Sequence, residues 1–137
     1  MNRNELAKNI GKTLKELQNQ ITEAALEVEK NIGPGFSPPD YCRALACEFA
    51  LREIPYQSNI EVDLPYKGNV AGKYRLDFVI DEKVILSVMA SDGISESEQS
   101  RQRSFLRALG LSLGIVVNFA DERVEIKAVH ANHTVKL

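Results

Sequence analysis

Apolar residues near the start of the chain recur at steps of three and four, which is the spacing of one face of an α-helix. They are Leu6, Ile10, Leu14, Leu17, Ile21, Ala25, Val28 and Ile32. This pattern predicts one long amphipathic helix, which ends at the Gly-Pro-Gly sequence of residues 33–35. A second helix should run from Ser37, the expected N-cap, toward Pro55, with prolines in its first turn and Asp40 three residues after the cap.

The middle of the chain has the patterns of strands. Residues 56–80 read as a strand, a glycine-containing turn and a second strand, and residues 84–90 read as a third strand after a charged turn. Residues 95–109 then predict a third helix, which begins with a capping box from Ser95 to Glu98.

Two further strands are expected after a helix stop at Gly110. The segment LSLGIVVNF, residues 111–119, is almost continuously apolar, which suits a central strand buried on both faces. The segment RVEIKAV, residues 123–129, alternates like a more exposed final strand. Because a strand, a helix and a buried strand in this order make a crossover, the predicted fold class is α/β, with a mixed β-sheet flanked by helices.

Residue parity decides how the second and third expected strands pair, because a shift of one residue exchanges the two faces of a strand. A three-residue turn at residues 81–83 makes one face wholly apolar. The apolar pairs are then Ile80 with Val84, Phe78 with Leu86, and Leu76 with Val88. This register places Asp77 opposite Ser87 on the second face. Met89 then lies opposite Arg75, one step along.

Composition suits one globular domain, since 137 residues with 44% hydrophobic and 26% charged side chains can bury a sizeable core. The formal charge of −2 would repel a polyanion, so any nucleic-acid surface has to be a local patch. The first residues lack the apolar core of a signal peptide, and no window approaches the roughly 18 apolar residues of a membrane span. A cytoplasmic protein without a membrane partner is expected. Cys42 and Cys47 point in different directions on a helix, which favours two reduced core thiols.

The order of these segments resembles a known family. A bent hairpin with an acid on one strand opposite an acid-x-lysine on the next, a long N-terminal helix and a helical crossover form the core of the PD-(D/E)XK nuclease superfamily, which has a restriction-endonuclease-like fold. More narrowly, ITEAALEVEKNIGPGF, YCRALACEFALREIPYQ, YKGNVAGKYRLDFVIDEKVIL and FLRALGLSLGIVVNF resemble successive blocks of the small bacterial GxxExxY family. The resemblance implies a single domain over residues 1–137, with a helical N-terminal extension at residues 1–20 and a family-like core at residues 21–129.

An active site of this family needs two acids and a lysine. The acids hold Mg²⁺ through oxygen ligands, the metal polarises the scissile phosphate, and the lysine helps to orient or activate the attacking water. By the resemblance, Asp77 is the first acid, whereas Ser87 and Met89 stand where the second acid and the lysine belong. Alternatively, a lone Asp77 could simply form an ion pair with Arg75 or cap a loop amide.

Other positions of the family's site are also altered. Its glycine and tyrosine match at Gly35 and Tyr41, but Pro38 stands where the glutamate belongs. Its glutamine on the crossover helix aligns with Arg101, although Gln102 is adjacent. The resemblance therefore supports the fold and implies a vestigial site, in which Pro38 suits the start of the second helix and Tyr41 is a core or groove-edge aromatic.

Charged residues elsewhere offer two further interpretations. Catalytic groups of this superfamily migrate between elements, so a rebuilt site could use Glu29, Glu48, Asp92, Lys73 or Lys83. No spacing compels that assignment. Arg101, Arg103 and Arg107 give the third helix a basic side, where the last two are neighbours four residues apart. This side is either a weak nucleic-acid contact or a solvated face.

The expected function is that of a pseudoenzyme, a non-catalytic descendant of the nuclease fold that binds a protein partner, its own copy or, weakly, a nucleic acid. No catalytic residue, metal ligand or cofactor is assigned under this interpretation. The alternative is a Mg²⁺-dependent nuclease with relocated catalytic residues, in which Asp77 would be one ligand of a weak metal site.

Overall fold

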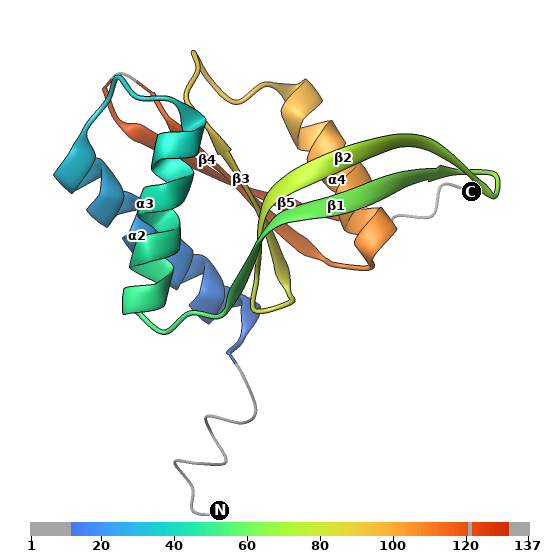
Figure 1. The fold of residues 1–137 in the computed structure, drawn as a ribbon, viewed down its shortest axis with the longest axis horizontal. Coiled ribbons are helices and arrows are strands. Elements are labelled where there is room, and N and C mark those ends of the chain that lie inside the picture. Colours follow the sequence, from blue (N-terminus) through green and yellow to red (C-terminus); the bar gives the residue numbers. More distant parts are fainter. Residues whose placement is uncertain (1–11, 121, 132–137) are drawn as a thin grey trace, which may run out of the picture.

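Three helices and five strands make up the part of the chain that the structure, a computed structural model, describes, namely residues 12–120 and 122–131. The helices are α2 (Leu14–Ile32), α3 (Pro38–Leu51) and α4 (Glu96–Leu109). The strands are β1 (Tyr56–Tyr66), β2 (Asn69–Ile80), β3 (Val84–Met89), β4 (Leu113–Phe119) and β5 (Val124–His130). They form one sheet in the order β1-β2-β3-β4-β5 (Figure 1). The predicted α/β fold with a mixed sheet is confirmed.

The sheet separates two hydrophobic layers, with α2 and α3 on one face and α4 on the other (Figure 1). The strand residues buried under α2 and α3 are Phe78, Ile80, Val84, Leu86, Val88, Leu113, Ile115, Val117 and Phe119. The strand residues of the α4 layer are Val62, Leu76, Val79, Ile85, Val116 and Val129. Because β4 contributes to both layers, all seven of its residues are buried, as its continuous apolar sequence predicts.

The first helix begins later than its apolar stripe predicts. α2 starts at Leu14, and the hydroxyl of its N-cap, Thr13, accepts a 3.1 Å hydrogen bond from the amide of Glu16. The expectation of one long helix that includes Leu6 is wrong at this point, because Thr13 has an extended backbone. Residues 1–11 of that stretch lie outside the described residues.

The local signals for the other two helices are confirmed. The Asp40 carboxylate accepts hydrogen bonds from the amide and the hydroxyl of Ser37, at 3.3 and 3.0 Å. The Ser95 hydroxyl accepts a 3.2 Å hydrogen bond from the amide of Glu98 at the start of α4. This helix ends at Gly110, whose φ of 70° lies in the left-handed region that favours glycine.

The predicted crossover is also present. β3 runs parallel to β4, and α4 connects them across one face of the sheet. β5 pairs with β4 in the antiparallel direction at the edge and is more exposed, as its alternating sequence predicts. Within the described ranges, no helix combines the length and apolar character needed to cross a membrane.

The two cysteines are free thiols in different surroundings. Cys42 is half-buried and packs against the core under α2 and α3, whereas Cys47 is exposed. The expectation of two core thiols is therefore wrong for Cys47. The buried stripe of α3 consists of Tyr41, Leu45 and Phe49, and a residue two positions after Leu45 points away from it.

Candidate functional site

Asp77 lies where β2 separates from β3. The ladder between these strands consists of Phe78 with Leu86, Val79 with Ile85, and Ile80 with Val84. These pairs confirm the three-residue turn. Just beyond the ladder, the Oδ2 atom of Asp77 accepts a 2.8 Å hydrogen bond from the amide of Val88. Asp77 therefore caps an amide, as one of its two structural alternatives predicts, but this amide belongs to a strand rather than a loop.

The register predicted beyond this point is wrong. The ladder does not include Leu76 with Val88, Asp77 with Ser87, or Arg75 with Met89. Leu76 packs in the α4 layer, whereas Phe78, which has the same parity, packs under α2 and α3. The strand therefore twists at Asp77. β1 is irregular at the same level, since Asn59 has a φ of 53°.

Burial shifts the pKa values of two side chains near this twist. It raises the pKa of Asp77, although the hydrogen bond from the Val88 amide acts in the opposite direction. Burial also raises the pKa of the Cys42 thiol to about 12, and the charge of Asp77 adds to the rise. Cys42 lies four residues after Pro38, so one face of α3 carries both residues. At neutral pH Cys42 is a protonated thiol and a poor nucleophile or metal ligand.

The side chain of Gln102, in α4, is buried beside Ser87. It is 2% exposed, and its Nε2 atom donates hydrogen bonds to the Ser87 hydroxyl at 3.2 Å and to the carbonyl of Ile115 at 3.0 Å. Its Oε1 atom has no hydrogen-bond partner among the described residues and faces Gly114. Ser87 is half-buried, and the hydrogen bond from Gln102 connects it to α4, the crossover helix.

Sequence reasoning missed the role of Gln102 because the family resemblance placed the glutamine at Arg101. The available signal is helical spacing, since Gln102 lies three and four residues before Phe105 and Leu106, the two apolar residues that α4 buries. A polar residue in that stripe must find a hydrogen bond inside the core.

Met89 occupies the expected lysine position, and its side chain is half-buried against the α4 layer. In the β3–β4 ladder it lies beside Asn118, which is fully buried. The Asn118 side chain accepts a hydrogen bond from the Ser91 amide at 2.9 Å and donates one to the Ser91 carbonyl at 2.8 Å. The polar contacts here hold the loop after β3, and the thioether of Met89 offers neither a cation nor an oxygen ligand.

Tyr41 and Pro38 support the connection between α2 and α3. The buried Tyr41 hydroxyl donates a 2.7 Å hydrogen bond to the carbonyl of Gly33 and accepts a 3.3 Å hydrogen bond from the amide of Phe36. Its ring stacks on Phe119 with 4.2 Å between the centroids. Pro38 is the first residue of α3. Both residues therefore have local structural roles.

The arginines of α4 differ in their contacts. Arg101 lies over the ring of Tyr74 in β2, with 5.5 Å between the guanidinium carbon and the ring centroid. Arg107 donates a 3.1 Å hydrogen bond to the hydroxyl of Ser104 in its own helix. Arg103, one turn before Arg107, is half-buried. Arg103 and Arg107 remain the candidates for a small basic patch.

The acids considered as replacement ligands have structural surroundings of their own. Glu29 accepts a hydrogen bond from the amide of Val124 at the start of β5. Glu48 forms an ion pair at 2.5 Å with Arg52, the C-cap residue of α3. Asp92 is exposed and lines a hollow after β3.

The two lysines considered as replacements also form local contacts. Lys73 lies in β2 at 3.9 Å from Glu61 and 3.8 Å from Asp63 on the neighbouring strand. Lys83 lies 3.4 Å from Asp81 in the turn between β2 and β3. The exposed ion pairs of Lys73 typically contribute about 0–1 kcal/mol each.

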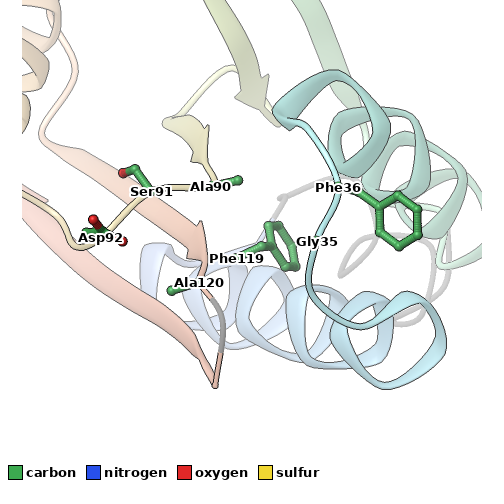
Figure 2. A pocket seen from close by; sticks show the side chains of 7 residues that line it. All are labelled: Gly35, Phe36, Ala90, Ser91, Asp92, Phe119 and Ala120. Atoms are coloured by element: carbon green, nitrogen blue, oxygen red, sulfur yellow. The ribbon is translucent and has the colours of Figure 1, made fainter.

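A small hollow of about 110 Å³ lies where β3 and β4 end (Figure 2). Its lining residues are Gly35, Phe36, Ala90, Ser91, Asp92, Phe119 and Ala120. In Figure 2 the segment from Ala90 to Asp92 faces Gly35, and Phe119 lies between them. Among the residues that the structure describes, no group of three or more His, Cys, Asp or Glu side chains is placed to hold a metal.

Comparisons with known proteins agree with this architecture. A family model described as the PD-(D/E)XK nuclease superfamily matches residues 15–129. No curated protein matches the chain. The crystal structure of SSO0001 has a similar fold, with a TM-score of 0.55 and 15% sequence identity. That similarity covers 85% of this chain and 64% of the other, so this chain spans less than two thirds of its length.

A second solved structure is the alkaline exonuclease LHK-Exo from Laribacter hongkongensis. Its TM-score is 0.46 at 10% identity, over 89% of this chain and 72% of that chain. The likeness to SSO0001, at its low identity, concerns the fold alone.

Proposed function

This chain belongs to the PD-(D/E)XK nuclease superfamily, and from that premise we propose that it is a non-catalytic member of the GxxExxY type, which acts by binding. One observation carries the proposal. The Asp77 carboxylate caps the Val88 amide, while a serine and a methionine stand at the acid and lysine positions of β3. The reaction needs charged groups that these positions do not supply.

The oxygen atoms present fit Mg²⁺ poorly. This ion requires near-octahedral oxygen coordination and is usually held through one or two carboxylates together with substrate phosphates. Asp77 offers one carboxylate that already accepts an amide hydrogen bond, and the Ser87 hydroxyl accepts one from Gln102. We therefore derive no hydrolytic step from these residues. A Mg²⁺-dependent nuclease that recruits its ligands elsewhere is the alternative that the experiment must exclude.

Metal binding and cleavage test the proposal directly. Calorimetric titration with Mg²⁺ and Mn²⁺ should give no saturable binding, and single-stranded, duplex and branched DNA and RNA should remain uncut. Asp77→Asn is the matched variant, because an asparagine oxygen can still accept the Val88 amide while the charge is removed. Metal-dependent cleavage that the wild type performs and Asp77→Asn loses would overturn the proposal.

Binding can involve a protein, a second copy of the chain or, weakly, a nucleic acid. Arg103 and Arg107 are the basis for the last of these, and so few phosphate contacts give little affinity at physiological salt. DNA retention should therefore be weak, fall with added salt and disappear in Arg103→Glu/Arg107→Glu. The charge-matched control is Lys15→Glu/Lys30→Glu, which changes two exposed lysines of α2 on the other layer. An equal loss of DNA retention in both double variants would indicate a nonspecific charge effect. The basic patch of Arg103 and Arg107 would then no longer be part of the proposal.

A further inference from the structure

The two edges of the sheet differ in how well they are protected. β1 carries an irregularity between Leu64 and Pro65 and a left-handed residue at Asn59, and such features discourage the addition of another strand. β5 pairs with β4 over seven consecutive residues without a shift, and it contains no proline or glycine. Within the described residues its only ladder neighbour is β4. A regular edge of this kind is a template for another strand.

Hydrogen bonds at the two ends of β5 identify the backbone groups that face outward. The amide of Ala131 donates a 3.0 Å hydrogen bond to the carbonyl of Ser112, so residues of this parity turn toward β4. The amide of Val124, of the other parity, donates to the Glu29 carboxylate instead. Because bonding alternates along an antiparallel ladder, the N–H and C=O groups of Ile126 face away from β4.

We infer that this edge binds a second copy of the chain, with the two β5 strands antiparallel and paired about Ile126. This register sets Glu125 opposite the partner's Lys127, and Lys127 opposite the partner's Glu125. Both side chains are exposed and share one face of the strand. Pairing about Lys127 would place two lysines opposite each other, and pairing about Glu125 would place two glutamates there. Of these three registers, charge therefore favours the one about Ile126, since opposite charges across strands stabilise and like charges destabilise.

Apolar contacts and backbone hydrogen bonds also favour the register about Ile126. The half-buried side chains of Val124, Ile126 and Ala128 lie on the other face of β5, against the layer under α2 and α3. Ile126 would pack on the partner's Ile126, and the two residues would exchange both of their outward backbone hydrogen bonds. The contact is isologous, so it closes as a dimer. One added strand pair is small beside the roughly 800 Å² per partner of a stable interface, so association should depend on concentration.

This inference names a partner for the proposed binding role, so it rests on the proposed function. An experiment can nevertheless refute one of the two and leave the other standing. Metal-dependent cleavage would overturn the proposed function and leave the dimer untouched. A chain that stays monomeric would overturn the dimer and leave the absence of catalysis untouched.

Sedimentation equilibrium from about 1 μM to about 1 mM tests the dimer. The wild type should associate reversibly, and Lys127→Glu should weaken association about tenfold, because two cross-strand attractions become repulsions. Glu125→Lys/Lys127→Glu restores opposite charges and should associate like the wild type. An equimolar mixture of Glu125→Lys and Lys127→Glu should form a mixed dimer, although each variant alone associates weakly. Circular dichroism establishes that each variant is folded.

A monomer over the whole concentration range would overturn the inference. So would a dimer that Lys127→Glu leaves unchanged, because its interface would then lie elsewhere. Failure of the charge-exchanged double variant to recover would overturn the register about Ile126.

Discussion

Gly114 in β4 provides the space that Gln102 of α4 occupies. A Cβ atom at position 114 would lie 2.3 Å from the Oε1 atom and 2.6 Å from the Cδ atom of Gln102, far inside van der Waals contact. The side-chain amide of Gln102 cannot move away without losing its hydrogen bonds to Ser87 and Ile115. Gly114→Ala should therefore displace this side chain or push the helix from the sheet.

The expected loss follows from these two effects. Overpacking a well-filled core costs about 1–3 kcal/mol, and each hydrogen bond lost contributes about 0.5–1.5 kcal/mol. Gly114→Ala should therefore lower the free energy of unfolding by about 2–3 kcal/mol. In a Gln102→Ala background the obstacle is gone, and alanine is favoured over glycine within a strand by about 0.5–1 kcal/mol. The same substitution should then be neutral or stabilising.

Urea unfolding of the wild type, the two single variants and the double variant measures this coupling as a double-mutant cycle. We expect a coupling free energy of about 3 kcal/mol, since the sign of the Gly114 effect reverses between backgrounds. An equal cost of Gly114→Ala in both backgrounds would refute the packing of Gln102 over Gly114. A cost below about 0.5 kcal/mol in the wild-type background would refute it as well.

Three further predictions concern buried polar groups. Tyr41→Phe should lower the free energy of unfolding by about 1–2 kcal/mol in urea, because the Gly33 carbonyl loses its hydroxyl donor; a change within error would contradict this role. Asn118→Asp should cost about 3 kcal/mol or more in the same assay, because it buries a carboxylate beside the Ser91 carbonyl. A near-neutral effect would be inconsistent with the buried hydrogen bonds between Asn118 and Ser91. Burial raises the pKa of Asp77 in the folded state above its value in the unfolded state. The wild type should therefore lose stability as the pH rises from the unfolded-state pKa through the folded-state pKa, whereas Asp77→Asn should not show this loss. Unfolding of both proteins from about pH 4 to about pH 7 checks this, and a pH-independent difference between them would contradict it.

Local features of the fold could be predicted because the physical cause lies within a few residues. Ser37 and Ser95 cap helices through groups three positions away, and Gly110 adopts the left-handed conformation that ends α4. The continuous apolar run of β4 predicted burial on both faces, which the structure confirms.

The hairpin of β2 and β3 shows where prediction from the sequence fails. Parity predicted the turn and the three pairs nearest to it, because a buried face penalises a slip of one residue. Parity assumes an untwisted strand, so it failed at Leu76, which the twist at Asp77 moves to the other layer. The twist also separates β2 from β3 and brings the carboxylate to the Val88 amide.

The candidate site likewise could be predicted from the sequence only in part. The sequence alone determined that an acid is present at position 77 and that positions 87 and 89 carry no charge. Only the tertiary structure decided that Gln102, rather than its neighbour Arg101, reaches Ser87. The sequence does not reveal that contact because it depends on how closely α4 approaches β4.

By itself, the amino-acid sequence determined the helices and strands, their order and the chemical groups available, because these follow from periodicity, caps and side-chain identity. The tertiary structure decided which of those groups meet. It assigned Asp77 to a strand amide, Tyr41 to the connection between α2 and α3, and Glu29 to the start of β5. The physical reason is that a buried polar atom bonds to the nearest group that packing brings within reach, which need not be a neighbour in sequence.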